Sequence, residues 1–436
     1  MMKFLIFSLM MMFCKKINFL QNMIFLMSFF MIFNMVDLNY YLISMNFGLN
    51  FYSYGLIMLV FWITGLMLLS VKFVNNKYIC SLMIMLLMII LMVTFSNLNF
   101  FLFYLFFEVS LVPTFIMIIY WGLGSQRILA SYYFLFYTMI FSLPMILILF
   151  ELDYVFGSLS LLLNKYYSLN LEEFYMIIML MCFLVKVPFY LMHSWLLKAH
   201  VEAPVFGSMI LASLLLKLGG YGLLLMLNLM YDYFNENFKN NLILISLMGS
   251  LVLSIICMCQ IDLKILVAYS SIVHMGMMLC GIFSMMKLGI LGSYMMMISH
   301  GFSSSGLFYL VNINYERLNS RLIYMNKGML SLMPSMGLMW FLLCSSNMAA
   351  PFSLNLVSEI FLIIIIMIYN IKLMILMILV CMFSFIYSLY LFSWIQHGKF
   401  MKMNKFSSGK LLEYLNLLLH WIPLNIMIFN LNVLIS

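Results

Sequence analysis

The segment VFGSMILASLLLKLGGYGLLLMLNL covers residues 205–229 and carries a single charge, Lys217, in an otherwise apolar run. A helix of roughly 20 apolar residues crosses a bilayer core about 30 Å thick, so a transmembrane helix is predicted here. The whole chain is similar, because 67% of its residues are hydrophobic and only 8% are charged. Soluble domains carry about 25% charged residues. The composition therefore predicts one polytopic membrane domain and excludes a soluble fold.

Polar interruptions divide the rest of the chain into similar runs, which gives about fourteen predicted spans. The spans cover residues 1–14, 18–36, 55–71, 79–96, 98–119, 128–150, 174–196, 204–229, 241–259, 263–285, 288–311, 329–367, 373–395 and 412–434. The first run has no small-residue cleavage site, so we expect a first helix and not a removable signal. The predicted fold class is an all-α polytopic membrane protein.

Basic residues are divided unequally between the two sides of these predicted spans. Two of the 21 Lys and Arg residues lie inside spans. Five lie on the side of the N-terminus: Lys3, Lys165, Lys239, Lys287 and Lys372. Fourteen lie on the other side: Lys15, Lys16, Lys72, Lys77, Arg127, Lys198, Lys264, Arg317, Arg321, Lys327, Lys399, Lys402, Lys405 and Lys410. Inner loops carry the excess of Lys and Arg. Both termini are therefore predicted to face outward, and the net charge of +8 indicates topology without any nucleic-acid partner.

Four charged residues fall near the predicted middle of the membrane, where each costs about 2.5 to 3.5 kcal/mol on insertion scales. Glu108, Lys186 and Lys217 lie well inside their spans, and Glu359 follows Pro351 in the long segment. A proton can cross a low-dielectric layer only on groups whose charged and neutral forms are close in free energy. Desolvation moves Lys and Glu side chains toward that condition. We predict that these residues carry protons; for Glu108 with Lys186, a purely structural ion pair is the alternative.

Four histidines extend this set of candidates. His193 and His200 bracket the end of the seventh span, His274 lies in the tenth and His300 in the eleventh. Histidine can exchange a proton near neutral pH because its pKa in water is about 6.5. All four are candidate relay residues, although a structural hydrogen bond is an equally good interpretation of any one of them. The eight cysteines form no CxxC pair or Cys/His cluster, so no metal site is predicted.

Two prolines predict broken helices beside the buried charges. Pro188 follows Lys186 by two residues, and Pro351 precedes Glu359. Unwound backbone is tolerated at membrane depth only where protein or a water-filled cavity covers it. Because the two breaks lie five spans apart, two inverted five-helix repeats are predicted. The predicted organisation is N-terminal helices (1–96, the fourth beginning the first repeat), first repeat (79–229), second repeat (241–395), and C-terminal loop and last helix (396–436).

Several motifs resemble those of one membrane protein family. They are FFEVSLVPTFIMIIYWG (106–122), YFLFYT (133–138), FLVKVPFY (183–190), HSWLLKAHVEAPVFGSMILASLLLKLGGYG (193–222), QIDLKILVAYSSIVHMG (260–276), SHGFSSSGLFYLVNINYERLNSR (299–321) and NLVSEI (355–360). Over residues 95–395 the sequence resembles chain 4 of mitochondrial NADH:ubiquinone oxidoreductase, respiratory complex I. KAHVEAP followed by LLKLGGYG distinguishes this chain from the sister antiporter-like subunits.

The resemblance implies a proton-translocating membrane-arm subunit related to cation/proton antiporters. The family's charged pair, its linking lysine and the acid assigned to its outer exit are matched by Glu108 and Lys186, by Lys217, and by Glu359. Its histidine positions are matched by His193, His200, His274 and His300. These residues are therefore the expected proton-translocation site.

The resemblance also implies a location and a set of partners. A multi-pass protein of the mitochondrial inner membrane is expected, with both termini on the intermembrane-space side. Its expected partners are the other membrane-arm subunits, including neighbouring antiporter-like subunits, together with lipid and protons. FMN, iron–sulfur clusters and ubiquinone are expected on other subunits, so this chain is expected to hold no cofactor.

The sequence departs from the family pattern near the predicted breaks. Leu197 replaces the usual proline before KAH, Ser358 replaces a common glycine, and AAPFS (349–353) replaces a double proline. These changes affect the shape of a broken helix more than the identity of the titrating groups.

At the basic side, Lys264 and Glu202 lie at predicted span ends, where either could serve proton uptake or only local structure. Three other functions stay open from the sequence. They are an independent cation/proton antiporter, a structural membrane scaffold, and a haem-containing oxidase in which two histidines ligate iron.

Overall fold

The computed structural model describes residues 2–32, 41–44, 46–71, 76–161, 173–229, 235–399, 407–429 and 431. Four lysines whose side of the membrane was predicted above lie outside these residues: Lys72, Lys165, Lys402 and Lys405. The elements in chain order are α1 (Met2–Met11), α2 (Ile17–Ile32), β1 (Tyr41–Ser44), β2 (Phe47–Leu49), α3 (Phe51–Ser70), α4 (Lys77–Ser96), α5 (Phe100–Val109), α6 (Leu111–Trp121), α7 (Arg127–Phe156), α8 (Glu173–Lys186), α9 (Ser194–Glu202), α10 (Val205–Ile210), the π-helix η3 (Leu211–Leu215), α11 (Leu216–Leu229), α12 (Glu236–Met258), α13 (Leu263–Phe283), α14 (Lys287–Leu318), the 3-10 helix η5 (Ile323–Asn326), α15 (Met329–Leu332), α16 (Pro334–Asn347), α17 (Leu354–Tyr369), α18 (Ile371–Gln396) and α19 (Leu411–Phe429).

The predicted all-α membrane fold is confirmed, with one short antiparallel hairpin, β1–β2, and three isolated β-bridges in the described residues. Within the same residues, nine helices are long and apolar enough to cross a membrane, or ten if one pair bent by 119° counts as a single span. Four further apolar helices are shorter, among them α8 and α17. The sequence predicted about fourteen runs because apolar composition continues through breaks that shorten the individual helices.

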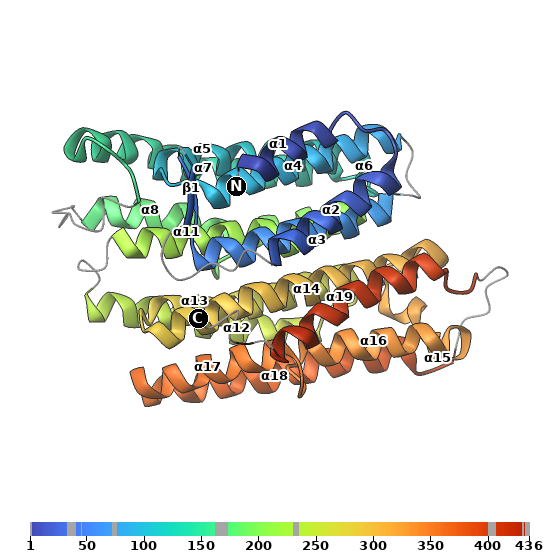
Figure 1. Cartoon of the computed structure of the whole chain (residues 1–436). Helices are drawn as coiled ribbons and strands as arrows, with labels where there is room; N and C mark the ends of the chain where they lie inside the picture. Colours follow the sequence, from blue (N-terminus) through green and yellow to red (C-terminus); the bar gives the residue numbers. More distant parts are fainter. Residues whose placement is uncertain are drawn as a thin grey trace.

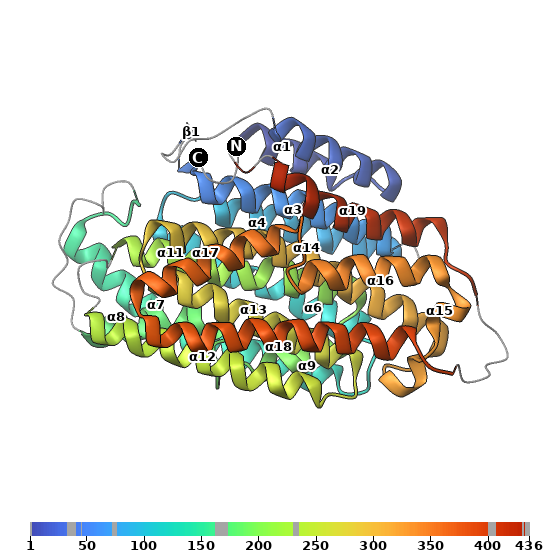
Figure 2. The same cartoon turned by 90° about the horizontal axis from the view of Figure 1, so that it is seen from below.

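The helices form two stacked groups whose members run side by side (Figure 1). One group holds α1–α11 and the other holds α12–α19, and Figure 2 looks at the stack from below, with helices of the second group such as α17 and α18 in front. Helix α14 joins them, because it packs on α3, α10 and η3 on one side and on α13 and α17 on the other. Most of its residues are buried, as expected for a helix surrounded by other helices.

The connections between helices meet at defined ends of the bundle. At one end, Leu123 N donates to Glu202 O at 3.1 Å, and Leu263 N donates to Arg321 O at 3.1 Å. Lys264 Nζ links these two pairs by donating to Ala203 O at 2.9 Å. The segments that meet at this end are ones for which the distribution of Lys and Arg predicts a common, basic side.

A break in the helix at Ser110 divides the predicted span 98–119 into α5 and α6. The sequence did not lead us to expect this break. Pro113 explains it, because proline has no N–H to offer the carbonyl of Val109. The hydroxyl of Ser110 donates to Phe107 O at 2.6 Å, and that of Thr114 donates to Leu111 O at 2.9 Å. The interruption lies two residues from Glu108, so local backbone irregularity accompanies this partly buried charge as well.

Candidate functional site

Lys186 is the last residue of α8, and its side chain meets Glu108 of α5. Its Nζ lies 3.3 Å from Glu108 Oε1, donates to Phe107 O at 3.3 Å, and sits 3.0 Å from the centroid of the Phe107 ring. The lysine side chain is 6% exposed and the glutamate side chain 17%. The predicted charged pair is therefore formed, with an aromatic face and a backbone carbonyl supplying the remaining contacts of the ammonium group.

Lys217 lies just after the π-helix η3 and is fully buried. Its Nζ donates to Ala212 O at 2.6 Å and lies 2.8 Å from His300 Nδ1. A π-helical turn bonds residues five apart in place of four and thereby alters which carbonyls the helix leaves free. Lys217 donates to the carbonyl of Ala212, five residues before it, so the irregular turn supplies an acceptor for the ammonium group.

His300 continues the contact chain toward Glu359 of α17. The His274 and His300 rings have their centroids 5.7 Å apart, and His274 Nδ1 lies 3.9 Å from Glu359 Oε1. All three side chains are buried. The structure thus brings four of the eight predicted residues into one row, in the order Lys217, His300, His274, Glu359. Lys186 and Glu108 form a separate pair, and within the described residues no hydrogen bond joins Lys186 to Lys217.

His193 and His200 lie outside this row. His193 stacks on Tyr190 with ring centroids 6.0 Å apart and faces Tyr269 at 6.4 Å. His200 stacks on Phe308 at 4.5 Å, and neither of its ring nitrogens has a hydrogen-bond partner in the part of the chain that the structure describes. Both histidines are therefore packed against aromatic rings.

The structure adds two side chains that the sequence analysis missed. Tyr387 of α18 lies with its hydroxyl 3.2 Å from His274 Nε2, and Cys381 of the same helix lies beside Glu359. Neither carries a sequence signal, because Tyr387 is one of 27 tyrosines in an apolar chain. Only the packing of α18 against α13 and α17 identifies them.

Both proline-associated interruptions are present. Residues 187–193 separate α8 from α9, and residues 348–353 separate α16 from α17. The replacements at Leu197 and Ser358 leave these interruptions in place, since Leu197 lies within α9 and Ser358 donates to Asn355 O at 2.7 Å in the first turns of α17. Lys186 therefore lies at the end of α8, directly before the first interruption, and Glu359 lies in α17, which begins after the second.

The site can pass a proton between neighbouring nitrogen and oxygen atoms. Each neutral imidazole offers one donor and one acceptor nitrogen, so a histidine can receive a proton on one side and release it on the other. The 2.8 Å contact between Lys217 and His300 allows direct transfer. The longer separations around His274 require a small movement or a bridging water. An apolar bundle with a buried row of such groups is the architecture of antiporter-like membrane proteins.

The comparisons with known proteins agree with that class. Residues 97–386 match a family described as NADH:quinone oxidoreductase/Mrp antiporter, and residues 1–96 match NADH-ubiquinone oxidoreductase chain 4, amino terminus. The chain belongs to the NADH-ubiquinone oxidoreductase chain 4 family. A chain 4 protein of Apis mellifera ligustica is 48% identical over 92% of this chain and 89% of its own length. The protein of that name from Aedes aegypti is 47% identical over 94% and 93%.

Solved structures share the fold at low sequence identity. A chain of respiratory complex I from Thermus thermophilus superposes with a TM-score of 0.87 at 21% identity, covering 99% of this chain and 96% of that one. A chain of the Mrp complex from Dietzia gives 0.83 at 17% identity, covering 95% of this chain and 48% of that one. At these identities the likeness shows the fold alone.

Proposed function

We propose that this chain is a proton-translocating membrane-arm subunit of respiratory complex I in the mitochondrial inner membrane. It takes part in NADH:ubiquinone reduction as a subunit, and the redox cofactors belong to other subunits. The observation that carries the proposal is the buried row from Lys217 through His300 and His274 to Glu359. Its expected neighbours are other membrane-arm subunits, including antiporter-like ones.

In the proposed mechanism, the Lys186–Glu108 pair acts as a switch. Contact with the carboxylate favours the charged lysine, and separation of the two groups favours proton release. Lys217 shares a proton with His300, and His274 passes it to Glu359, which lies nearest the outer exit. Tyr387 fixes the orientation of His274 by occupying its Nε2. Each step uses groups of this chain and, across the longer gaps, bridging water.

The finer architecture is part of the same proposal. We infer about fourteen crossings, with the shorter helices such as α8 and α17 completing spans together with their neighbours. Residues 79–229 and 241–395 form inverted repeats, in which the α8–α9 break corresponds to the α16–α17 break. Both termini face the intermembrane space, because the basic connections gather at the opposite end.

An independent cation/proton antiporter is the second candidate, and the likeness to the Mrp complex favours it. We prefer the complex I subunit because relatives of that name match at 47–48% identity over nearly their whole length. The Mrp likeness is 17% identical and covers 48% of that chain. The fold is shared by both classes, whereas the sequence is shared with one.

The test is Lys217→Ala in the assembled complex, with NADH-driven acidification measured in proteoliposomes. Without the lysine, His300 has no partner to deliver a proton, and proton transfer through this subunit should slow by about a hundredfold. The matched control is Lys198→Ala, since Lys198 is exposed and lies over the Tyr133 ring at 3.3 Å, outside the row. Unchanged proton pumping in the Lys217 variant would show that the chain is only a scaffold.

A further inference from the structure

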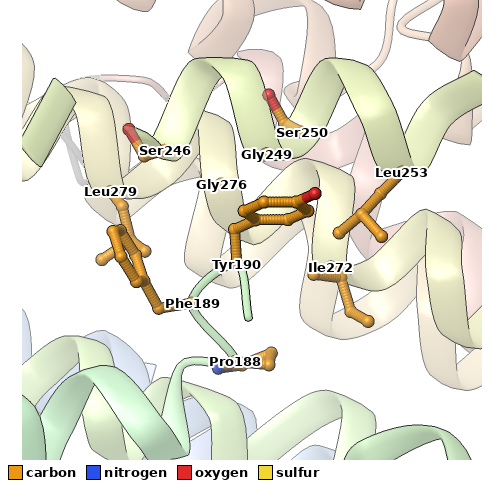
Figure 3. A pocket seen from close by; sticks show the side chains of 10 residues that line it. All are labelled: Pro188, Phe189, Tyr190, Ser246, Gly249, Ser250, Leu253, Ile272, Gly276 and Leu279. Carbon is orange, nitrogen blue, oxygen red and sulfur yellow. The ribbon is translucent and has the colours of Figure 1, made fainter. Parts of the chain in front are cut away.

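Two aromatic residues of the connection between α8 and α9 pack against the second helix group. Figure 3 shows Phe189 and Tyr190 extending from this connection toward α12 and α13. They line a cavity of about 10 Å³, together with residues of these two helices that include Gly249 and Gly276. A cavity of this size is at the lower limit for holding one water molecule. The aromatic pair is therefore closely packed against α12 and α13.

Gly249 on α12 is in close contact with Tyr190, and this contact leaves no room for a side chain at position 249. A Cβ atom at position 249 would overlap Tyr190 Cβ and would lie 2.6 Å from its Cγ. Real Cβ atoms do not approach other carbons this closely, so an alanine would displace the ring. Gly276 of α13 is similarly tight against α12, because a Cβ there would lie 3.0 Å from Ser250 Cβ. Helices α12 and α13 thus form a close-packed platform under the ring.

The same tyrosine also lies close in sequence to the Lys186–Glu108 pair of the proposed site. Its ring stacks on His193, with an angle of 15° between the planes, and His193 faces Tyr269 of the platform. Four residues before Tyr190 in sequence, Lys186 ends α8 and makes its 3.3 Å contact with Glu108. The platform helix α13 also carries His274. A single ring therefore connects the end of α8 to the helix that carries part of the proton row.

We propose that Tyr190, seated on Gly249, is a positioning residue that sets the distance between Lys186 and Glu108. This inference rests on the proposed function and adds to it the group that fixes the geometry of the charged pair. Charge attraction at short range in a buried site depends steeply on separation. A displacement of about 1 Å changes the paired population roughly fivefold to tenfold. Loss of the contact between Tyr190 and Gly249 should therefore slow proton pumping without removing any proton-carrying group.

The experiment measures NADH-driven proton pumping per assembled complex for Tyr190→Ala, Gly249→Ala and the double variant. Each single variant should pump roughly fivefold slower, and the double variant should be no slower than Tyr190→Ala, because both changes remove one contact. Tyr190→Phe keeps the ring and should pump normally. Ser254→Ala, on α12 but outside the cavity, is the matched control.

Two outcomes separate failure of this inference from failure of the proposed function. If Lys186→Met slows pumping while Tyr190→Ala and Gly249→Ala only lower the amount of assembled complex, Tyr190 has a structural role alone and the inference is wrong. Additive losses in the double variant would also overturn it, because they would indicate two independent contacts. If Lys186→Met itself leaves pumping unchanged, the proposed function fails first.

Discussion

At the residue scale, Lys217 shows how a lysine can be stabilised inside an apolar bundle without a carboxylate. It has no ion pair in the described part of the chain and is stabilised by one carbonyl and one imidazole. A buried polar group costs several kcal/mol unless it is hydrogen-bonded. A partner without charge leaves the proton free to move between Lys217 and His300, whereas a carboxylate would hold it on the lysine.

A prediction at this scale concerns Tyr387. In Tyr387→Phe the ring remains and the hydroxyl is lost, so His274 Nε2 has no partner and its ring can turn away from Glu359. Loss of one such hydrogen bond is worth about 1 kcal/mol, which corresponds to roughly a fivefold decrease in proton pumping per assembled complex. Tyr390→Phe is the control, because Tyr390 lies on the same helix beside Trp394. Equal pumping in both variants would remove Tyr387 from the site.

At the element scale, irregular helices position the charges. Lys186 ends α8, Lys217 follows a π-helical turn, and Glu359 lies in the helix that restarts after residues 348–353. Each irregularity leaves backbone carbonyls or a helix end near an ionisable side chain, which a continuous α-helix would not provide. The long helix α14, by contrast, supplies His300 from a regular helical segment.

A prediction at this scale concerns the contact of α3 with α14. A Cβ at Gly55 would overlap the hydroxyl of Tyr294, which donates to Phe51 O at 3.2 Å. Gly55→Ala should therefore lower the stability of the protein by about 1 to 3 kcal/mol, because the tyrosine is buried and cannot move freely. Thermal unfolding of the purified complex measures the loss.

The control for this prediction is the double variant Gly55→Ala with Tyr294→Phe. Removing the hydroxyl relieves the overlap, so the double variant should be more stable than Gly55→Ala alone. Equal melting temperatures for the wild type and Gly55→Ala would show that α3 and α14 are less closely packed than described.

At the scale of the whole molecule, the two helix groups share one row of ionisable side chains. Lys217 comes from the first group, and His300, His274 and Glu359 come from the second. In the proposed mechanism, protons therefore move from one helix group to the other. A buried ion pair between Arg317 and Glu413 fastens α19 onto α14 and closes the second group.

Sidedness gives a prediction at this scale. Cys259 is exposed at the end of α12, next to the connections that gather on the basic side, whereas Cys257 in the same turn is buried. A membrane-impermeant thiol reagent should modify Cys259 from the matrix side only, and peptide mass spectrometry detects the product. Cys257 is the internal control and should stay unmodified from either side. Modification of Cys259 from the intermembrane space would reverse the proposed orientation.

Much of the fold could be predicted because the free-energy cost of placing a residue in the membrane depends mainly on its own side chain. Apolar length indicated the membrane fold, the cost of charge in hydrocarbon singled out the four acids and bases, and Pro188 and Pro351 marked the two interruptions. The division at Ser110 was missed, although Pro113 offered a signal, because the apolar run continues through it. The π-helical turn before Lys217 has no composition of its own and could not be predicted.

The sequence by itself determined that this protein spans a membrane and that Lys186, Lys217 and Glu359 are buried in it. Only the tertiary structure decided which groups meet. Lys217 and His300 are 83 residues apart, and Tyr387 and His274 are 113 apart. The physical reason is that depth in the membrane follows from local hydropathy, whereas contacts depend on the rotation and packing of each helix against its neighbours. Of the 27 tyrosines, Tyr387 meets His274 only through that packing.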